Sequence, residues 1–404
     1  MKHRIVVLGA GYTGATAAGR LARRLHRQDV SITLVNAEPD FVERVRLHQL
    51  AVGQGLETRP FSEMFAGTGV ELKLAKVTGI DVDRRTVTVG VTGMADTEDL
   101  EYDSLLYALG SGWNTQGVPG TAEHAHDITG RPGALRLRER LAALDAGQPV
   151  VVVGGGLTGL EAATEIAEAR PDLDVALVAH GALGDWLSPK GRGHVRKVFA
   201  GLGITAHEHT AVTAVEAGHV TTADGKDIPA AVTVWTAGFA VHPIAQETAL
   251  EVTGTGQIVV DRTMRSVSHP DVYAIGDAAM AMGPGDKPLR MSCASGGFTA
   301  LQAADTIAAR LAGTKIPNVP IRYFNQCISL GRREGLIQYV TADDRAVRAA
   351  LTGRLAAVYK ELVCKGAAWG VGNPTFGMPT RRRRVVRAGA GPAVKESAAV
   401  DTSA

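Results

Sequence analysis

Two glycine triplets with the same spacing are the residues of this 404-residue chain best suited to chemistry. The triplets lie in GAGYTG (Gly9, Gly11 and Gly14) and in GGGLTG (Gly154, Gly156 and Gly159). In a G-x-G-x-x-G motif the first glycine permits a tight turn, the second lets a pyrophosphate approach the backbone, and the third lets a helix pack close to a strand. The phosphates then face free N–H groups at the helix N-terminus. The chain is therefore predicted to bind two dinucleotides, one held permanently and one exchanging.

The elements around each triplet support this prediction. Each motif follows a short apolar run, residues 5–8 and 150–153, of the kind that forms a strand buried on both faces. After the first motif, apolar residues recur at Ala18, Leu21 and Leu25, which is helical spacing. A strand, a glycine loop and a helix in this order distinguish a dinucleotide site from an ordinary glycine-rich turn.

The ribose positions of the two units lack the usual acid. In the first unit, the strand predicted over residues 31–36 ends at Asn36, with Glu38 two residues on, where an acidic side chain commonly binds ribose hydroxyls. In the second unit, the strand at 174–178 is followed by Ala179 and His180. Basic residues follow it at Lys190, Arg192, Arg196 and Lys197. Since no acid repels a 2′-phosphate and these bases can bind one, NADH and NADPH both remain open.

Further polar or glycine residues stand at other strand ends. One strand ends in the turn that holds Ala108 and Gly110, and WTAGF repeats this pattern at Gly238. Asp277 ends the strand in YAIGDAA, where a carboxylate can accept hydrogen bonds from polyol hydroxyls. The same aspartate is equally compatible with a helix N-cap. Trp235 is expected in the core.

The C-terminal third predicts a helix over residues 291–312, then two or three strands from about 317. A helix is predicted near residues 344–365, with apolar side chains on one face and basic ones on the other. The apolar residues are Val347, Leu351, Leu355, Val358 and Leu362, and the basic ones are Arg345, Arg348, Arg354, Lys360 and Lys365. This helix either docks on its own domain or contacts a membrane surface. The arginines at 381–384 could meet anionic lipid or a partner, and the tail is expected to be mobile.

Composition narrows the class of protein. The net charge of +2 gives no reason to expect a nucleic-acid partner. Three widely separated cysteines read as reduced thiols and exclude a closely spaced redox disulfide. No metal-ligand cluster is recognisable, and neither a signal peptide nor an apolar run of about 18 residues is present. We therefore expect a cytoplasmic protein, with peripheral contact at the membrane face and a homodimer both open.

These motifs together resemble the flavoproteins with two dinucleotide-binding domains. The resemblance is greatest to the type II NADH dehydrogenases and their apoptosis-inducing-factor-like and ferredoxin-reductase-like relatives. It covers roughly residues 1–370 and rests on GAGYTG, YALGS, GGGLTGLEAATE, WTAGF and YAIGDAA, in that order. No cysteine stands directly after the second predicted strand, so the chain does not resemble the peroxidase or coenzyme-A-disulfide branches. None occurs before Cys293, so it does not resemble the sulfide:quinone branch either, which needs a cysteine in the middle of the chain.

The resemblance implies FAD on the first motif and NAD(P)H on the second. The expected FAD contacts are Gly9, Gly11, Tyr12, Thr13, Gly14, Asn36, Glu38, Arg44, Ala108, Gly110 and Asp277. The expected NAD(P)H contacts are Gly154, Gly156, Leu157, Thr158, Gly159 and Gly238. Glu161 matches the family glutamate near the meeting of nicotinamide and flavin, where it can orient a base or relay a proton, although a surface helix residue is the alternative.

The segment at 41–55 carries Arg44, Arg46 and His48 at alternate positions. One interpretation is a solvated loop that leads into a short helix. The other is that at least one of the three lies over the flavin and stabilises negative charge on its reduced ring. Arg46 and His48 are therefore catalytic candidates, together with Glu161.

The predicted architecture is α/β, with a split FAD domain at 1–113 and 244–315 and an NAD(P)H domain at 114–243. A small α+β cap spans 316–380, and a basic tail spans 381–404. Both large domains are Rossmann-like. The predicted activity is hydride transfer from NAD(P)H to the flavin, followed by electron transfer to a quinone or quinone-like small molecule.

Two alternatives to that activity stay open. The quinone-site helix of the type II dehydrogenases usually carries AQ-x-A-x-Q, whereas this chain has SCASGGFTALQ. A reductase that feeds a protein carrier such as a ferredoxin would use a basic docking face. A flavin-binding protein whose output is interaction would show slow flavin reduction.

Overall fold

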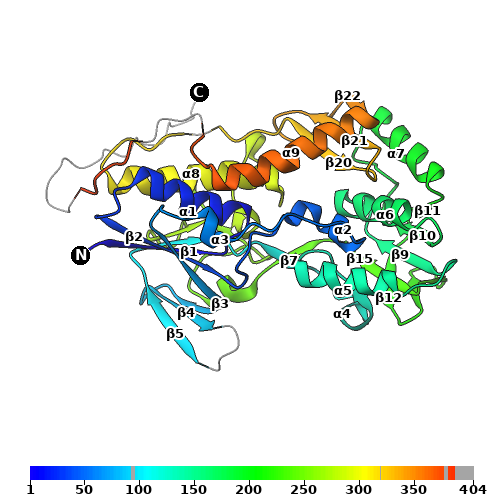
Figure 1. The fold of residues 1–404 in the computed structure, drawn as a ribbon, viewed down its shortest axis with the longest axis horizontal. Helices are drawn as coiled ribbons and strands as arrows, with labels where there is room; N and C mark the ends of the chain where they lie inside the picture. Colours follow the sequence, from blue (N-terminus) through cyan, green and yellow to red (C-terminus); the bar gives the residue numbers. More distant parts are fainter. Residues whose placement is uncertain (92–95, 319, 377–380, 387–404) are drawn as a thin grey trace, which may run out of the picture.

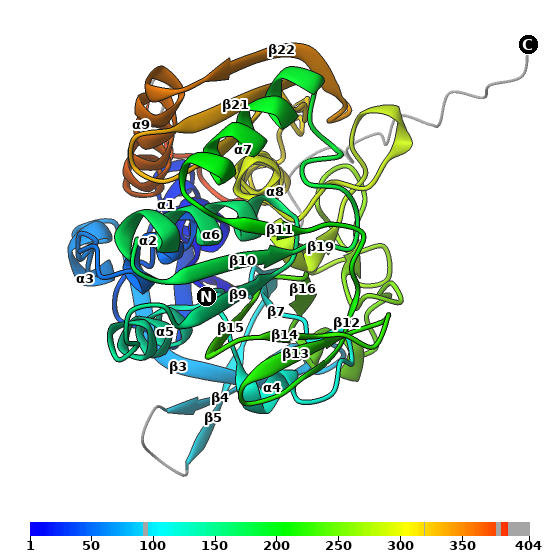
Figure 2. The same cartoon turned by 90° about the vertical axis from the view of Figure 1, so that its right-hand side faces the viewer.

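The computed structural model describes residues 1–91, 96–318, 320–376 and 381–386 (Figure 1). Two Rossmann-like sheets lie at opposite ends of the long axis, and a C-terminal sheet and helix lie along one side of both (Figures 1 and 2). The predicted α/β fold class is confirmed.

The first sheet is built around the strand that precedes GAGYTG. Its order is β18 (Val272–Ala274), β6 (Ser104–Tyr107), β1 (His3–Leu8), β2 (Val30–Asn36), β3 (Val70–Asp81), β4 (Thr86–Val91) and β5 (Thr97–Glu101). The pairs from β18 to β3 are parallel, and β3–β4–β5 is an antiparallel extension. Val7 and Leu8, which point to opposite faces of this sheet, are both fully buried, and helices α1 (Tyr12–Arg24) and α8 (Cys293–Leu311) pack side by side over one of these faces.

The second sheet repeats the arrangement around the strand before GGGLTG. Its parallel strands follow the order β11 (Thr205–His207), β10 (Asp174–Val178), β9 (Pro149–Val153), β15 (Val232–Trp235) and β8 (Ala125–His126). The helices of this unit are α4 (Thr121–His124), α5 (Arg131–Ala142), α6 (Leu157–Ala169) and α7 (Pro189–Gly201). A small antiparallel sheet follows, made of β12 (Val212–Val215), β13 (His219–Thr222) and β14 (Asp227–Pro229).

A two-stranded ribbon carries the chain between the two units. Strand β7 (Ser111–Trp113) pairs antiparallel with β16 (Phe239–Val241), and the domain boundaries proposed from sequence lie just beyond these strands. The remaining short elements are η1 (Arg44–Arg46), α2 (Leu47–Ala51), α3 (Phe61–Met64), η2 (Pro243–Glu247), β17 (Ile258–Val259), η3 (Gly276–Ala278), β19 (Ala279–Met280) and η4 (Pro284–Asp286).

The C-terminal layer corrects one sequence prediction. Strands β20 (Asn325–Ser329), β21 (Gly335–Val340) and β22 (Ala346–Thr352) form an antiparallel sheet, and α9 (Arg354–Gly372) follows it. The helix predicted near 344–365 was therefore wrong over its first part. Apolar residues four apart, such as Val347 and Leu351, share a face of a helix and also share a face of a strand. Pairing of Leu351 with Ile337 decides for the strand, and Gly353 at φ +81° separates it from the helix.

The arginine run near the C-terminal end was expected to be part of a mobile tail, but up to residue 386 it is bound to the rest of the protein. The Arg383 backbone N–H donates to the Arg24 carbonyl at 2.8 Å, and its own carbonyl accepts from His26 at 2.9 Å. The Arg384 guanidinium lies 3.2 Å from the Asp29 carboxylate. Residues 381–386 thus run along the end of α1. The rest of the predicted tail lies outside the described residues.

Candidate active site

A cavity of about 1660 Å³ lies where the carboxyl ends of both parallel sheets face each other. Strand-end residues of the first unit (Asn36, Ala108) and of the second (Val153, Val178) line it. In α/β sheets, ligands bind outside the carboxyl ends of the strands. Both glycine motifs therefore open into one shared space.

The helices after the two motifs begin without a side-chain cap. The N-cap residues of α1 and α6 are Gly11 and Gly156, and neither helix start receives a capping hydrogen bond from a side chain. By contrast, Ser188 and Ser292 cap α7 and α8 through their hydroxyls. A Cβ at Gly11 or Gly156 would meet no protein atom within 4 Å. The free N–H groups and the open space in front of them suit a pyrophosphate.

The other motif glycines serve the backbone. Gly9 and Gly154 adopt φ +90° and +126°, which favours glycine. A Cβ at Gly14 or at Gly159 would collide with the carbonyl oxygen of the glycine that opens its motif. Gly14 and Gly159 therefore allow the helix to cross its strand and do not themselves line the cavity.

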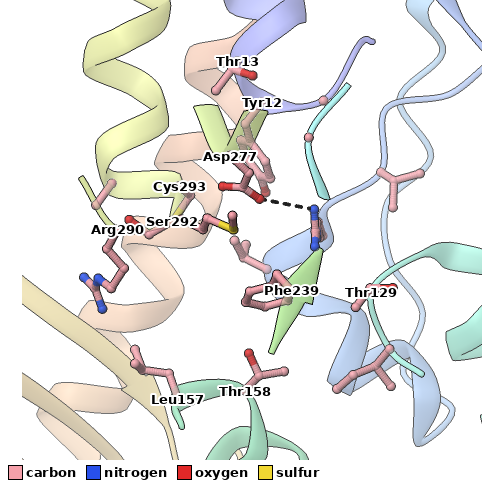
Figure 3. A pocket seen from close by; sticks show the side chains of 18 of the residues that line it. Tyr12, Thr13, Thr129, Leu157, Thr158, Phe239, Asp277, Arg290, Ser292 and Cys293 are labelled. Atoms are coloured by element: carbon pink, nitrogen blue, oxygen red, sulfur yellow. Dashed lines mark ion pairs between the residues drawn. The ribbon is translucent and has the colours of Figure 1, made fainter. Parts of the chain in front are cut away.

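Unpartnered polar groups around the first motif fit a bound dinucleotide. Tyr12 and Thr13 line the cavity beside the start of α8 (Figure 3). The Tyr12 hydroxyl is buried and has no hydrogen-bond partner among the described residues. Asn36 lines the cavity while its side chain accepts from the Ala10 N–H at 2.9 Å. Glu38 is exposed and does not line the cavity, so of the two ribose candidates only Asn36 is in place.

Asp277 belongs to a polar network at the centre of the cavity. The Ser111 hydroxyl donates to its carboxylate at 2.6 Å, and the Arg44 guanidinium lies 3.6 Å from the same oxygen (Figure 3, dashed line). Arg44 also stacks over the Phe239 ring at 5.2 Å. Burial lowers the pKa of Arg44, although Asp277 partly offsets this. Because Ile275 is the N-cap of η3, the N-cap interpretation of Asp277 is not realised.

The basic segment separates into three different environments. Arg44 and His48 line the cavity, whereas Arg46 does not and instead pairs with Glu361 and with Glu43. His48 is 4% exposed, and burial lowers its pKa to about 4 despite the nearby Glu161 carboxylate. His48 is therefore neutral near pH 7 and supplies no positive charge. Arg44 is the member of the segment that combines charge with a place in the cavity wall.

Glu161 forms a buried ion pair that the sequence did not predict. It lies at the start of the second turn of α6, and the Lys360 ammonium of α9 approaches its carboxylate at 2.9 Å. The Ser329 N–H donates to the same carboxylate at 3.0 Å, and His48 Nδ1 lies 4.0 Å from its other oxygen. Burial alone would raise the pKa of Glu161 and lower that of Lys360, but the attraction and hydrogen bond between them, together with neighbouring groups such as the Ser329 N–H, reverse both directions. Both groups are thus charged at neutral pH, and both line the cavity.

Lys360 was visible in the sequence only as one basic residue on an amphipathic helix. Its neighbours come from α6 and β20, and its Nζ also donates to the Cys327 carbonyl at 3.1 Å. The sequence places Lys360 on the basic side of this helix, opposite Leu355 and Leu362, but in the structure those two leucines are strongly exposed and the Lys360 side chain is mostly buried. Only the docking of α9 against the second unit identifies it.

The expected contacts of the exchanging nucleotide, apart from Gly159, also line the cavity. Leu157 and Thr158 project from the start of α6 across from Asp277 (Figure 3), and Gly154, Gly156 and Gly238 lie beside them. Trp235 is buried as predicted, with its indole N–H donating to the Asn114 carbonyl at 2.7 Å, and its edge reaches the cavity as well.

The cysteines are free thiols. Cys293, Cys327 and Cys364 all line the cavity, and burial raises the pKa of Cys327 to about 11. The described residues contain no group of His, Cys, Asp and Glu side chains arranged to hold a metal ion. Within the same ranges, every helix is too short or too polar to span a bilayer.

Comparison with known proteins agrees with this geometry. The chain is 32% identical over 315 residues to an NADH dehydrogenase-like protein of Mycobacterium tuberculosis, which covers 72% of this chain and 77% of that protein. It is 27% identical over 376 residues to a demethylphylloquinone reductase of Synechocystis, covering 88% and 92%. Its fold matches the NADH-bound structure of NDH2 from Plasmodium falciparum with a TM-score of 0.76 at 15% identity, over 95% of this chain and 100% of that one.

The family model of the pyridine nucleotide-disulphide oxidoreductases matches residues 3–307. The chain therefore belongs to this family. The predictions of an oxidoreductase, of FAD as its cofactor and of NAD(P)H as its reductant are confirmed. The uncapped start of α1, the open face of Gly11 and the unpartnered Tyr12 hydroxyl are the features of this chain that fit FAD.

Proposed function

We propose that this chain is an FAD-dependent NAD(P)H dehydrogenase that passes electrons to a quinone or a quinone-like molecule. FAD, when bound, supplies the two-electron chemistry that links the nicotinamide to the acceptor. The chain's own residues bind both nucleotides, orient them in one cavity and set the charge around the acceptor. The relative named as a demethylphylloquinone reductase, which aligns over most of both chains, supports a quinone acceptor.

The observation that carries this proposal is an apolar cavity wall that continues onto the protein surface. Helices α8 and α9 contribute Phe298, Leu301, Ala367 and Val371 to the wall. Val363 of α9 lines the cavity and is 40% exposed. Phe376, just after α9, does the same at 73% exposed. An aromatic acceptor with an apolar substituent can therefore enter along α9 without crossing a polar barrier.

The α9 patch is the surface end of this route. It consists of the exposed apolar residues Leu355, Val358, Tyr359, Leu362, Val363, Trp369 and Phe376. Exposed basic residues accompany it: Arg354 and Lys365 lie on the same helix, and Arg332 pairs with Glu361 of α9, as Lys365 does. Apolar side chains flanked by cations suit the interface of a membrane with anionic lipids, and we include peripheral membrane contact in the proposal.

The Lys360–Glu161 pair gives the site its charge. The ammonium of Lys360 faces the cavity and can donate a hydrogen bond to an acceptor oxygen that gains negative charge. Glu161 holds this ammonium in place and keeps it protonated. Neutral His48 beside Glu161 adds a second hydrogen-bonding group without a second positive charge.

The test is anaerobic stopped-flow absorbance of the holoprotein on phosphatidylglycerol-containing vesicles. The protein is reduced with NADH and then mixed with an isoprenoid-tailed naphthoquinone or a tail-less one. Leu362→Glu should slow reoxidation by the tailed quinone about tenfold or more, because burying a leucine side chain is worth roughly 1.5–3 kcal/mol. Reduction by NADH and reoxidation by the tail-less quinone should be unchanged.

The matched control is Val267→Glu, which changes an apolar residue of similar exposure far from α9 in sequence. It should leave both reoxidation rates as in the wild type. Fast reduction followed by reoxidation that neither quinone accelerates would contradict the proposal and favour a protein carrier. No flavin reduction by NADH, or by NADPH in a parallel run, would contradict the proposal and favour the interaction protein.

A further inference from the structure

The second Rossmann unit decides which nicotinamide nucleotide enters. The ribose 2′ position of the exchanging nucleotide is recognised just after β10, in residues 179–183. His180 lines the cavity there, and Thr210, Ala211 and Val212 line it from the neighbouring strand end. The sequence left NADPH open because four basic residues follow this loop.

The structure turns those four basic side chains away from the cavity. Lys190 donates to the Ala350 carbonyl of β22 at 2.7 Å, and Arg192 donates to the Asp185 carbonyl at 3.0 Å. Arg196 makes two hydrogen bonds to Glu208, at 2.6 and 3.0 Å. None of Lys190, Arg192, Arg196 and Lys197 lines the cavity that the described residues enclose.

Glu208 is the residue that organises this region. It follows β11 directly, and its carboxylate accepts from the Leu183 N–H at 2.5 Å as well as from Arg196 of α7 (Figure 2 shows β10, β11 and α7 together). The hydrogen bond from Arg196 lowers the pKa of Glu208, so the carboxylate is charged at neutral pH. A guanidinium and a loop N–H are the donors that a phosphate would need, and this carboxylate uses both.

A second carboxylate borders the same loop. A Cβ at Gly181 would lie 2.6 Å from an Asp185 carboxylate oxygen, so this side chain rests against the loop backbone. The loop is also tied to the strand that carries Glu208, since the His209 and Thr210 N–H groups donate to the Gly181 and Ala179 carbonyls. The loop after β10 is thus bordered by two carboxylates, and the Arg196 guanidinium beside it is already engaged by one of them.

We propose that Glu208 makes this chain selective for NADH over NADPH, because it binds Arg196 and the Leu183 N–H that would otherwise hold the 2′-phosphate. The inference deepens the proposed function by naming its reductant, and it requires only that NAD(P)H binds the second motif. It does not depend on the acceptor. Its test therefore omits quinone and can fail independently of the quinone proposal.

The experiment measures binding and flavin reduction in the holoprotein. Glu208→Gln keeps the shape of the side chain but releases Arg196. It should raise the NADPH efficiency of flavin reduction at least about tenfold, as a gained charge-assisted contact implies, and leave that of NADH within about threefold. Calorimetry should show the same gain without any turnover: Glu208→Gln should bind 2′,5′-ADP more tightly than the wild type does and should bind AMP equally well. Glu208→Gln/Arg196→Gln should lose the gain.

Asp172→Asn is the matched control, since Asp172 pairs with Arg170 in the same unit as Glu208 does with Arg196. It should leave the efficiency of flavin reduction by NADH and by NADPH unchanged. Arg196→Gln, which tests the idea even if Glu208→Gln does not fold, should also leave NADPH use unchanged. The proposal is overturned if the wild type binds 2′,5′-ADP more tightly than AMP. It is also overturned if Glu208→Gln does not raise the efficiency of flavin reduction by NADPH, or if Arg196→Gln lowers that efficiency.

Discussion

At the scale of single residues, the pKa values of two carboxylates one helical turn apart are shifted in opposite directions. Glu161 is paired with Lys360 and its pKa is lowered. Glu165 is 1% exposed, and burial raises its pKa to about 7. One of its oxygens accepts from the Gln54 amide, and the other has no hydrogen-bond partner among the described residues. The nearby Lys360 ammonium therefore keeps Glu161 ionised, whereas Glu165, which has no such ion pair, is easily protonated.

Glu165→Gln should stabilise the protein at pH 8 and change little at pH 5. The folded-state pKa lies above the ordinary value of 4.5, so the stability linked to this proton is complete at low pH and is lost as pH rises through about 7. The gain at pH 8 should reach roughly 3 kcal/mol at most. Thermal or urea unfolding at the two pH values measures it.

The control for this pH dependence is Glu139→Gln, at an exposed glutamate on α5. It should shift stability equally little at both pH values. An equal effect of Glu165→Gln at pH 5 and pH 8 would show that the Glu165 side chain does not hold a proton in the folded protein.

At the scale of elements, the strand–loop–helix unit assigns different tasks to glycines three residues apart. In the second unit, Gly156 leaves space for a pyrophosphate, whereas Gly159 lets α6 cross the strand beneath it. The same division holds in the first unit at Gly11 and Gly14. Binding and packing can therefore be separated by substitution.

Gly156→Ala should fold with its flavin and bind NADH more weakly, because the new methyl group enters the phosphate space without meeting protein. Gly159→Ala should lower the melting temperature, because its methyl group would collide with the Gly154 carbonyl and approach the Thr236 hydroxyl at 2.9 Å. Calorimetric melting and NADH titration of both variants check this. Weak NADH binding by Gly159→Ala with an unchanged melting temperature would contradict the division.

At the scale of the whole molecule, a buried ion pair joins segments from both ends of the chain. Arg20 of α1 binds Asp305 of α8 through two hydrogen bonds, at 2.8 and 2.6 Å, and also donates to the Pro374 carbonyl after α9. Both side chains of the pair are less than 10% exposed. The first Rossmann unit and the C-terminal layer are thus held at one point behind the flavin site.

Asp305→Asn should destabilise the protein by about 3–5 kcal/mol, because Arg20 remains buried without its counter-charge. Arg20→Met/Asp305→Leu should recover part of this loss, because the most deeply buried charge is then removed, while Arg24, whose guanidinium lies 3.2 Å from Asp305, still loses its partner. Urea unfolding of the holoprotein measures both. A double variant as unstable as Asp305→Asn would mean that the pair is needed for its geometry and not only for charge balance.

The sequence by itself determined the features that depend on local rules. The glycine triplets, the apolar runs before them and the strand-end positions of Ala108 and Asp277 predicted two Rossmann units that open into a dinucleotide site. Such features need only a turn, a buried strand and a helix start within about ten residues. Short-range backbone geometry encodes them, so spacing reveals them.

Tertiary structure alone decided the features that depend on distant neighbours. Lys360 became part of the site because α9 docks beside α6, and His48 lost its charge because it is buried. Strand β22 replaced a predicted helix because β21 pairs with it. Arg196 is bound by Glu208, which follows strand β11 and does not belong to the α7 helix that carries Arg196. Burial and charge pairing depend on which segments meet in space. The hydrophobic periodicity and the residue types along the chain do not determine which segments meet.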